Sequence, residues 1–248
     1  MGGVKRILLT VAYDGTRYSG FARQENRETI AGTLETVLSE LTGETVEITG
    51  ASRTDAGVHA YGNLAVFDTS SVIPVERFAR ILNDRLPEDI RITSSEEASG
   101  DYDPRKTGRI KTYEYRIFNG ELRDPMLRLY TYRYPFPLDV DAMNKAAAFL
   151  VGEHDFTSFC NPDTQALTRV RNITACSVRR DGEMVIITVS GEGFLYNMVR
   201  IIAGTLMETG RGLRSISDIP RILDAKDRRE AGFTAPPEGH FLIGYSVV

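Results

Sequence analysis

Residues 45–69, TVEITGASRTDAGVHAYGNLAVFDT, decide the fold class of this sequence. The two ends of the stretch, 45–50 and 62–69, are rich in β-branched and apolar residues, a composition typical of strands. The glycine-punctuated segment 51–60 between them predicts a loop, and it places the carboxylate of Asp55 among small residues. The stretch therefore predicts two consecutive strands joined by a loop that carries one acid.

The segments that flank these strands complete a βαββαβ order. Apolar residues at helical spacing from Ile30 to Leu41 predict a helix, with Thr29 as its N-cap and Gly43 as its end. The other predicted elements are strands at 4–13 and 89–94 and a helix at about 74–86. This is the split βαβ, or ferredoxin-like, order, in which two helices cover one face of a four-stranded antiparallel sheet.

The rest of the chain repeats this order approximately. Its predicted elements are strands at 110–119 and 127–134, a helix at about 140–151, strands at 173–180 and 184–190, helices at about 194–209 and 217–225, and a strand at 241–247. The segment between the halves is short and charged, unlike a flexible linker. We therefore expect an α+β protein of two ferredoxin-like, RRM-like halves, 1–105 and 106–248, joined into one extended antiparallel sheet with a central active-site cleft.

The composition is that of an ordinary globular protein, with 42% hydrophobic and 26% charged residues among 248. No apolar run approaches the roughly 20 residues that a membrane helix needs. Because the first residues also lack a signal-peptide pattern, we expect a cytoplasmic protein without a membrane role. The two cysteines and three scattered histidines do not fit the ligand spacing of a zinc site, so we expect no metal.

The basic residues are unusual in kind and in place. Only 5 of the 30 basic side chains are lysines, which leaves 25 arginines, whose planar guanidinium matches phosphate oxygens. Residues 105–133 contain an excess of basic over acidic side chains, formed by Arg105, Lys106, Arg109, Lys111, Arg116, Arg123, Arg128 and Arg133. By charge alone, and with a net charge of −4 for the chain, a solvated strand face is the favoured interpretation of this basic stripe.

Asp55 allows two interpretations. A carboxylate close to an anomeric carbon can form a covalent intermediate, as it does in glycosidases. An aspartate in a loop that contains glycine is also commonly a turn residue that bonds its own backbone. For an isolated Thr-Asp-Ala-Gly the second interpretation is favoured.

The octapeptide RTDAGVHA, residues 53–60, changes this balance because it resembles the active-site signature of the tRNA pseudouridine synthase A (TruA) family. The resemblance continues along nearly the whole chain, in family order, at 13–16 with 18–20, 111–115, 152–156, 193–200 and 235–239. The family pattern commonly has Trp-Gln where this chain has Phe21-Ala22, glutamine where it has Asn63, and an apolar residue where it has His240.

The resemblance implies a reaction and a set of catalytic residues. The family isomerises uridine to pseudouridine without a cofactor, at positions 38 to 40 in the anticodon arm of tRNA. Asp55 matches the essential aspartate, a nucleophile that acts at C1′ or through a glycal route. Tyr113 matches the tyrosine that packs on the target base, and Arg200 the basic partner that keeps the carboxylate ionised.

The resemblance also implies how RNA is bound. Arg53 matches the arginine that enters the RNA stem as the uridine flips out, and filling that vacancy offsets part of the cost of extrusion. We expect Arg105, Arg109 and Lys111 to contact RNA as well. The family further implies a homodimer, while His59 belongs to the loop and is expected to make a structural bond. The segment Glu153-His154-Asp155 is expected at the end of a helix.

Two other classes of function remain as alternatives. A noncatalytic RNA-binding module would use Tyr113 and Tyr115 to stack on bases. A glycosidase-like hydrolase would need a second carboxylic acid to protonate the leaving group, which no motif supplies. Replacement of Asp55 distinguishes the first alternative, because a binding module has no need of that carboxylate.

Overall fold

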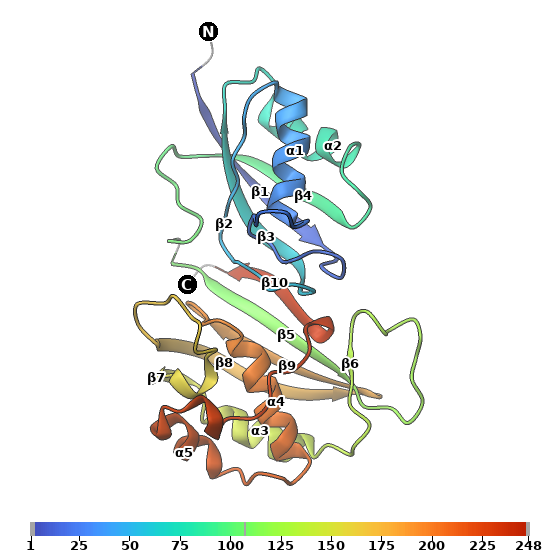
Figure 1. The fold of residues 1–248 in the computed structure, drawn as a ribbon, viewed down its shortest axis with the longest axis vertical. Coiled ribbons are helices and arrows are strands. Elements are labelled where there is room, and N and C mark those ends of the chain that lie inside the picture. The colour runs from blue at the N-terminus through green and yellow to red at the C-terminus, as the bar shows by residue number, and fades with distance from the viewer. Residues whose placement is uncertain (1–2, 107, 247–248) are drawn as a thin grey trace. The chain divides into compact units, whose positions relative to one another are not determined.

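The computed structural model describes residues 3–106 and 108–246. The chain divides into two compact units. Unit 1 comprises Met1–Gly108 with Leu242–Tyr245, and unit 2 comprises Arg109–Phe241 with Ser246–Val248. Figure 1 shows the elements of both units. None of the helices in the described part of the chain has the length and apolarity that crossing a membrane requires.

Unit 1 follows the predicted order. Its elements are β1 (Lys5–Tyr13), α1 (Ile30–Thr42), β2 (Thr49–Gly50), β3 (His59–Thr69), α2 (Phe78–Asn83) and β4 (Ile90–Ala98). The strands run in the order β4-β1-β3, both β1 pairs are antiparallel, and β2 pairs with β3. Residues of the last strand, β10 (His240–Ser246), follow β3 in this order.

Helix α1 begins and ends where the sequence predicts. The Thr29 side chain accepts a hydrogen bond from the backbone N–H of Gly32, and Gly43 ends the helix with φ of 72°. The Gly43 N–H also donates to the Ser39 carbonyl. The two bonds satisfy backbone groups that a helix leaves unpaired at its ends. On β1 the alternate residues Ile7, Leu9, Val11 and Tyr13 are buried, as a half-buried strand requires.

The predicted strand 45–50 is wrong over most of its length, because β2 contains only two residues. Side chains of α1 bond the preceding backbone in place of a neighbouring strand. Ser39 Oγ accepts from the N–H of Val46 at 3.1 Å, and a Glu35 carboxylate oxygen accepts from the N–H of Ile48 at 3.0 Å. The segment is therefore held by α1 and enters the sheet only at its end.

Unit 2 contains the remaining elements. They are β5 (Ile110–Phe118), β6 (Tyr132–Arg133), α3 (Val140–Ala148), β7 (Gly152–Asp155), β8 (Val170–Asp181), β9 (Met184–Gly191), α4 (Met198–Gly210) and α5 (Asp218–Ala225). The strand order is β10-β5-β9-β8-β7, and β6 pairs with β5 in parallel. The prediction of an α+β fold with a large, mostly antiparallel sheet is confirmed.

Two predictions for unit 2 are wrong. The strand expected at 127–134 is reduced to the two residues of β6, because the hydroxyl of Thr131 and the N–H of Tyr130 both bond the Leu127 carbonyl and form a turn. The segment Glu153-His154-Asp155, expected at a helix end, lies in β7 and pairs with β8. The helix stops at Ala148, before this segment begins.

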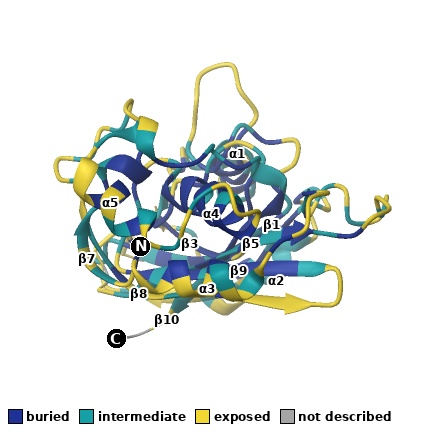
Figure 2. Ribbon diagram, turned by 90° about the horizontal axis from the view of Figure 1, so that it is seen from below, coloured by how far each residue is buried: buried dark blue, intermediate teal, exposed yellow. Residues whose placement is uncertain are grey.

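Helix α4 is the core of unit 2. Eleven of its thirteen residues are buried, and the helix is dark blue along most of its length in Figure 2. It contacts α3 and β5, and α3 packs on β8. Its first turn begins at Met198, after Asn197 in the left-handed conformation with φ of 59°, and therefore starts four residues later than predicted.

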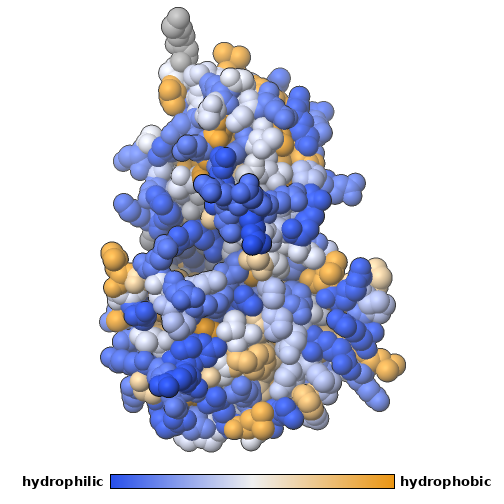
Figure 3. Space-filling view, in the orientation of Figure 1, coloured by the Kyte–Doolittle hydropathy of each residue, from blue (hydrophilic) through white to orange (hydrophobic). Residues whose placement is uncertain are grey.

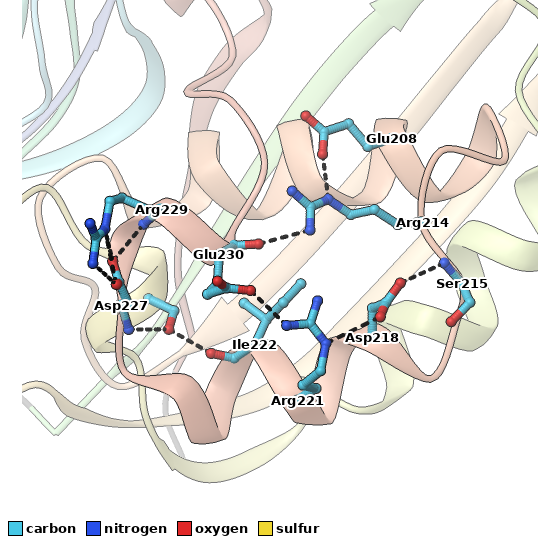
Figure 4. Close-up of polar contacts among 10 residues, drawn as sticks. Glu208, Arg214, Ser215, Asp218, Arg221, Ile222, Asp227, Arg229 and Glu230 are labelled. Carbon is cyan, nitrogen blue, oxygen red and sulfur yellow. Dashed lines mark hydrogen bonds and ion pairs between the residues drawn. The ribbon is translucent and has the colours of Figure 1, made fainter.

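Ion pairs attach α5 to α4 at the surface of unit 2 (Figure 4). Arg214 pairs with Glu208 of α4 and donates to the Glu230 carbonyl at 2.8 Å. Arg221 of α5 joins the Glu230 carboxylate at 2.6 Å and Asp218 at 3.3 Å. The face drawn in Figure 3 is mostly hydrophilic, with hydrophobic residues in small separate groups. A series of charged side chains thus connects α5 to α4.

Candidate functional site

The loop that carries Asp55 lies in unit 1, between β2 and β3. Its side chains alternate in exposure: Ser52 and Thr54 are buried, Arg53 is exposed, and Asp55 is half-buried. The guanidinium of Arg53 thus faces solvent two residues before the carboxylate. The Arg53 side chain is thus exposed while Ser52 and Thr54, on either side of it, are buried in the protein.

Residues 15–21 clamp the backbone of this loop. The N–H of Phe21 donates to the Thr54 carbonyl at 3.1 Å, and the N–H of Gly57 donates to the Tyr18 carbonyl at 3.3 Å. Gly20 has φ of +93°, and a Cβ there would lie 2.6 Å from the Thr54 carbonyl oxygen. Only glycine allows this close approach, so the motif at 18–20 can pack against the motif at 53–60.

His59 makes structural contacts, as the sequence analysis expects. It is buried at the start of β3, and its Nδ1 lies 3.2 Å from the backbone N–H of Gly15 and 3.1 Å from an Asp14 carboxylate oxygen. A Cβ on Gly15 would lie 2.0 Å from the Val58 carbonyl oxygen. The imidazole therefore connects the end of the loop to the turn after β1.

Phe21, one of the departures from the family pattern, is a core residue of unit 1. It is 1% exposed, and its ring lies 5.9 Å from that of Tyr13. A Cβ on Gly50, at the start of the loop, would lie 2.2 Å from the Phe21 ring. The aromatic side chain therefore supports the strand end from which the loop departs.

Tyr113 and Tyr115 lie on one face of β5 in unit 2, and the alternation expected for this strand is confirmed. The Tyr113 ring packs edge-on against Phe194 at 5.0 Å and tilted against His240 at 5.0 Å. Tyr115 is fully buried and donates to the Pro236 carbonyl at 2.7 Å. Burial holds the pKa of Tyr115 well above its ordinary value; nearby Glu238 adds to this shift and Arg200 opposes it.

Arg200 projects from the first turn of α4 and is half-buried. Its Nε donates to the Ala235 carbonyl at 2.6 Å, while its own carbonyl accepts from the Ala235 N–H at 3.1 Å. The segment 235–239, one of the motifs in the sequence, therefore fixes Arg200 through its backbone. Since Pro236 also binds Tyr115, the same short segment positions an arginine and a tyrosine.

Lys111 is half-buried at the start of β5, on the Tyr113 face. Burial lowers the pKa of Lys111, and the charge of Arg171 on β8 lowers it further. Burial also lowers the pKa of Arg171. Two cations that are partly removed from water lie within electrostatic reach of each other, which makes this part of unit 2 favourable for an anion.

Several other members of the basic stripe are paired with carboxylates or half-buried. Arg105, exposed in unit 1, pairs with Asp103 at 3.0 Å, and Asp103 raises its pKa. Arg116 pairs with Glu114 at 2.8 Å and stacks on the Phe241 ring at 4.0 Å. Arg109 is half-buried in unit 2. Neighbouring carboxylates therefore neutralise part of the stripe.

The predicted site residues divide between the two units. Asp55, Arg53 and Arg105 belong to unit 1; Tyr113, Arg109, Lys111 and Arg200 belong to unit 2. Within unit 2 the structure brings Tyr113, Tyr115 and Arg200 to the segment around Pro236 and His240. The pairing of Asp55 with Arg200 joins residues of different units and stays a prediction.

Sequence reasoning missed the role of Asn63. This residue is fully buried on β3, and its amide nitrogen donates to the Ser52 carbonyl at 2.9 Å. An amide side chain inside an otherwise apolar strand segment, GNLAVF, was the available signal, because a buried amide requires hydrogen-bond partners. Its partners lie too far away in sequence to be identified from the pattern.

Comparison with known proteins identifies the family of this chain. A family model described as tRNA pseudouridine synthase matches residues 9–105 and 146–246, which include the Asp55 loop and α4. The chain belongs to this family. Its members are isomerases that convert uridine to pseudouridine, and the resemblance carried by RTDAGVHA and the other motifs is confirmed.

Several curated members of the family are similar to the chain over almost its whole length. A tRNA pseudouridine synthase A of Caldicellulosiruptor bescii is 46% identical over 240 residues, which are 97% of this chain and 98% of that protein. The protein of the same description from Brevibacillus brevis is 46% identical over 236 residues, 95% of this chain and 97% of that protein. The one from Halalkalibacterium halodurans is 44% identical over 241 residues, 97% and 91% respectively.

Proposed function

We propose that this protein isomerises uridine to pseudouridine in the anticodon arm of tRNA, at positions 38 to 40, with Asp55 as the nucleophile. The observation that carries the proposal is the Asp55 loop: a half-buried carboxylate on a backbone clamped by residues 15–21, in a chain that belongs to the tRNA pseudouridine synthase family. Fixed geometry of this kind is what a nucleophile needs, since reacting atoms must be held close together and aligned.

In the proposed reaction the bond between uracil N1 and ribose C1′ breaks, the uracil rotates, and C5 bonds to C1′. The C5 hydrogen leaves as a proton and N1 gains a proton, so the product is an isomer of the substrate. The ionised carboxylate of Asp55 either attacks C1′ and forms an ester-like intermediate or supports a glycal route. In both routes the carboxylate is regenerated at the end of the cycle.

Tyr113 and Arg200 assist this carboxylate in the proposal. The Tyr113 ring, fixed by Phe194 and His240, packs on the target base. The guanidinium of Arg200 keeps Asp55 ionised, because a nearby cation opposes the effect of desolvation on a carboxylate. The hydrogen bond of Arg200 to the Ala235 carbonyl supports this role by limiting the positions that the guanidinium can adopt.

RNA recognition in the proposal depends on phosphate contacts and on base extrusion. Arg53 is exposed next to Asp55, as a side chain that replaces a flipped uridine has to be. Lys111, Arg109 and Arg105 contact phosphates, and Lys111 lies in the part of unit 2 that favours an anion. We also propose a cytoplasmic homodimer, since a subunit with a net charge of −4 gains from combining the basic surfaces of two copies.

We further propose that both halves are ferredoxin-like. In the first half the fourth, first, third and second strands are neighbours in that order, as β4-β1-β3-β2. In the second half the corresponding order is β10-β5-β9-β8. Both orders are those of the βαββαβ arrangement, and β6 and β7 are additions to it.

The experiment that tests the function is tritium release from tRNA labelled at uracil C5. We expect release by the wild type, because joining C5 to C1′ must expel that hydrogen. Asp55→Ala should abolish release while keeping tRNA binding. Asp84→Ala, at an exposed position after α2, is the matched control and should keep wild-type release.

Three results would contradict the proposal or part of it. Bound tRNA with no release by the wild type would favour the noncatalytic RNA-binding module. Accumulation of free uracil that still carries its C5 tritium, without formation of pseudouridine, would favour a hydrolase. Full release by Asp55→Ala would keep the reaction but remove Asp55 from the role of nucleophile.

A further inference from the structure

A hydrogen-bond network behind the Asp55 loop begins at Asn63 on β3. The side-chain amide of Asn63 bonds both backbone groups of Ser52: its Oδ1 accepts from the Ser52 N–H at 3.3 Å and its Nδ2 donates to the Ser52 carbonyl at 2.9 Å. This double contact also fixes the orientation of the amide, because only one arrangement of oxygen and nitrogen satisfies both backbone groups. Ser52 is therefore held on both sides.

The last strand contributes the second member of the network. The hydroxyl of Tyr245, on β10, lies within hydrogen-bond distance of two acceptors, Ser52 Oγ at 2.7 Å and Asn63 Oδ1 at 2.9 Å. These residues are separated by 193 and 182 positions in the sequence, and all of them belong to unit 1. The end of the chain thus supports the loop that carries the proposed nucleophile.

Tyr13 extends the network to the residue next to Asp55. Asn63 Nδ2 donates to the Tyr13 oxygen at 3.3 Å, and the Tyr13 hydroxyl lies 2.7 Å from Thr54 Oγ1. Because the Tyr13 oxygen accepts from Asn63, its own proton is available for Thr54. The network therefore forms hydrogen bonds with Ser52 and Thr54, the two residues that flank Arg53. Thr54 directly precedes Asp55.

Most of this network is buried. Asn63 is 0% exposed, Tyr13 5%, Ser52 5% and Thr54 8%, while Tyr245 is half-buried. Water cannot replace a lost partner at such positions, so removal of one hydroxyl leaves its buried neighbours unsatisfied or forces the loop to move. An apolar core under the loop would give similar burial but no such directional constraint.

We propose that Asn63 and Tyr245 are positioning residues for the reaction: they set the Asp55 carboxylate through Ser52, Tyr13 and Thr54. This inference rests on the proposed function of Asp55. Neither residue touches the substrate, so their removal slows the chemical step and leaves tRNA affinity nearly unchanged.

The test compares Tyr245→Phe with Tyr102→Phe in single-turnover tritium release at saturating tRNA. Tyr102 is the matched control, since its hydroxyl is buried in unit 1 and has no hydrogen-bond partner among the described residues. Displacements of about 1 Å can cost up to about 100-fold in rate, and loss of one hydroxyl from this network should cost about tenfold. We expect this loss for Tyr245→Phe, a dissociation constant for tRNA within about twofold of wild type, and no rate change for Tyr102→Phe.

A second variant separates positioning from general stability. Asn63→Asp has nearly the same shape but loses both N–H donors when ionised, while the protonated carboxyl regains one donor. Its rate relative to wild type should therefore rise as the pH is lowered. Because a buried ionised carboxylate also destabilises the fold, circular dichroism at every assay pH checks that the variant is folded, and only rates of folded protein are compared.

Equal rates for Tyr245→Phe and Tyr102→Phe, or a loss confined to tRNA affinity, would overturn the inference. If in the same experiment Asp55→Ala is inactive and the wild type active, the proposed function stands and only the positioning role fails. If the wild type releases no tritium, or Asp55→Ala releases it fully, the proposed function of Asp55 fails and the positioning role fails with it.

Discussion

Gly204 in the middle of α4 provides a test of how this protein holds Arg200. A Cβ at this position would lie 1.9 Å from the Phe233 carbonyl oxygen, whereas real Cβ contacts essentially never fall below 3.0 Å. In Gly204→Ala the segment 232–235 must therefore move away by about 1.1 Å. Helix propensity alone predicts the opposite effect, a gain of about 1 kcal/mol for alanine over glycine.

The displacement breaks the hydrogen bonds between this segment and α4. The bond from Arg200 Nε to the Ala235 carbonyl would lengthen from 2.6 Å to about 3.7 Å, beyond hydrogen-bond distance. The bonds from the Ala235 N–H at 3.1 Å and from the Gly232 N–H to Thr205 Oγ1 at 2.9 Å would also break. Three bonds at about 1 kcal/mol each, less the propensity gain, leave a net loss of about 2 kcal/mol.

The assay for Gly204→Ala is urea unfolding followed by far-ultraviolet circular dichroism, since the chain contains no tryptophan. A loss of about 2 kcal/mol corresponds to a melting temperature lower by about 4–8 °C for a chain of this size. Gly100→Ala is the control, because a Cβ there meets no atom within 4 Å. If Gly204→Ala were as stable as wild type or more stable, propensity would outweigh the contact and the reasoning would be refuted.

Three further predictions concern single contacts. Asp155 has a pKa below its ordinary value of 3.8, because Thr157 and Lys226 bond its carboxylate. Its contribution to stability is therefore present above about pH 4 and is lost as the pH falls through the lowered pKa. Asp155→Asn should show a shallower loss of unfolding free energy in that range. Tyr115→Phe removes the bond to the Pro236 carbonyl and should lower the unfolding free energy by about 1 kcal/mol. Arg53→Ala should weaken tRNA binding and turnover together in filter-binding and tritium-release assays.

Each of these predictions has an outcome that contradicts it. Equal pH profiles for Asp155→Asn and wild type would show that the carboxylate is not stabilised by folding. A Tyr115→Phe protein as stable as wild type would mean that another group satisfies the Pro236 carbonyl. Unchanged kinetics of Arg53→Ala would exclude its proposed entry into the RNA stem.

Local sequence was sufficient for several elements. The helix from Ile30, with Thr29 and Gly43 at its ends, and the alternation of Tyr113 and Tyr115 on β5 are confirmed. Caps and periodicity depend on residues only a few positions apart, so the sequence contains all the partners that decide them. The motif RTDAGVHA likewise placed Asp55 in a loop, because glycine and small residues act on the backbone where they stand.

Other elements depended on partners far away in sequence. The strand expected at 45–50 was shortened because Glu35 and Ser39 of α1 bond its backbone, and β7 was missed because its ladder with β8 depends on a distant segment. Whether a backbone N–H finds a strand, a side chain or a turn is decided by the competition among all nearby acceptors. That competition exists only after the chain has folded.

Residue types and motifs were enough to predict an α+β protein of the tRNA pseudouridine synthase family and to identify the acid in its signature motif. What holds that acid in place depends on contacts between segments that are distant in the sequence. Asn63 and Tyr245 lie 182 positions apart and meet because β3 and the end of the chain enter one unit. Periodicity shows which way a side chain faces, but hydrogen-bond partners are chosen by distances of a few ångströms between segments that the sequence alone does not bring together.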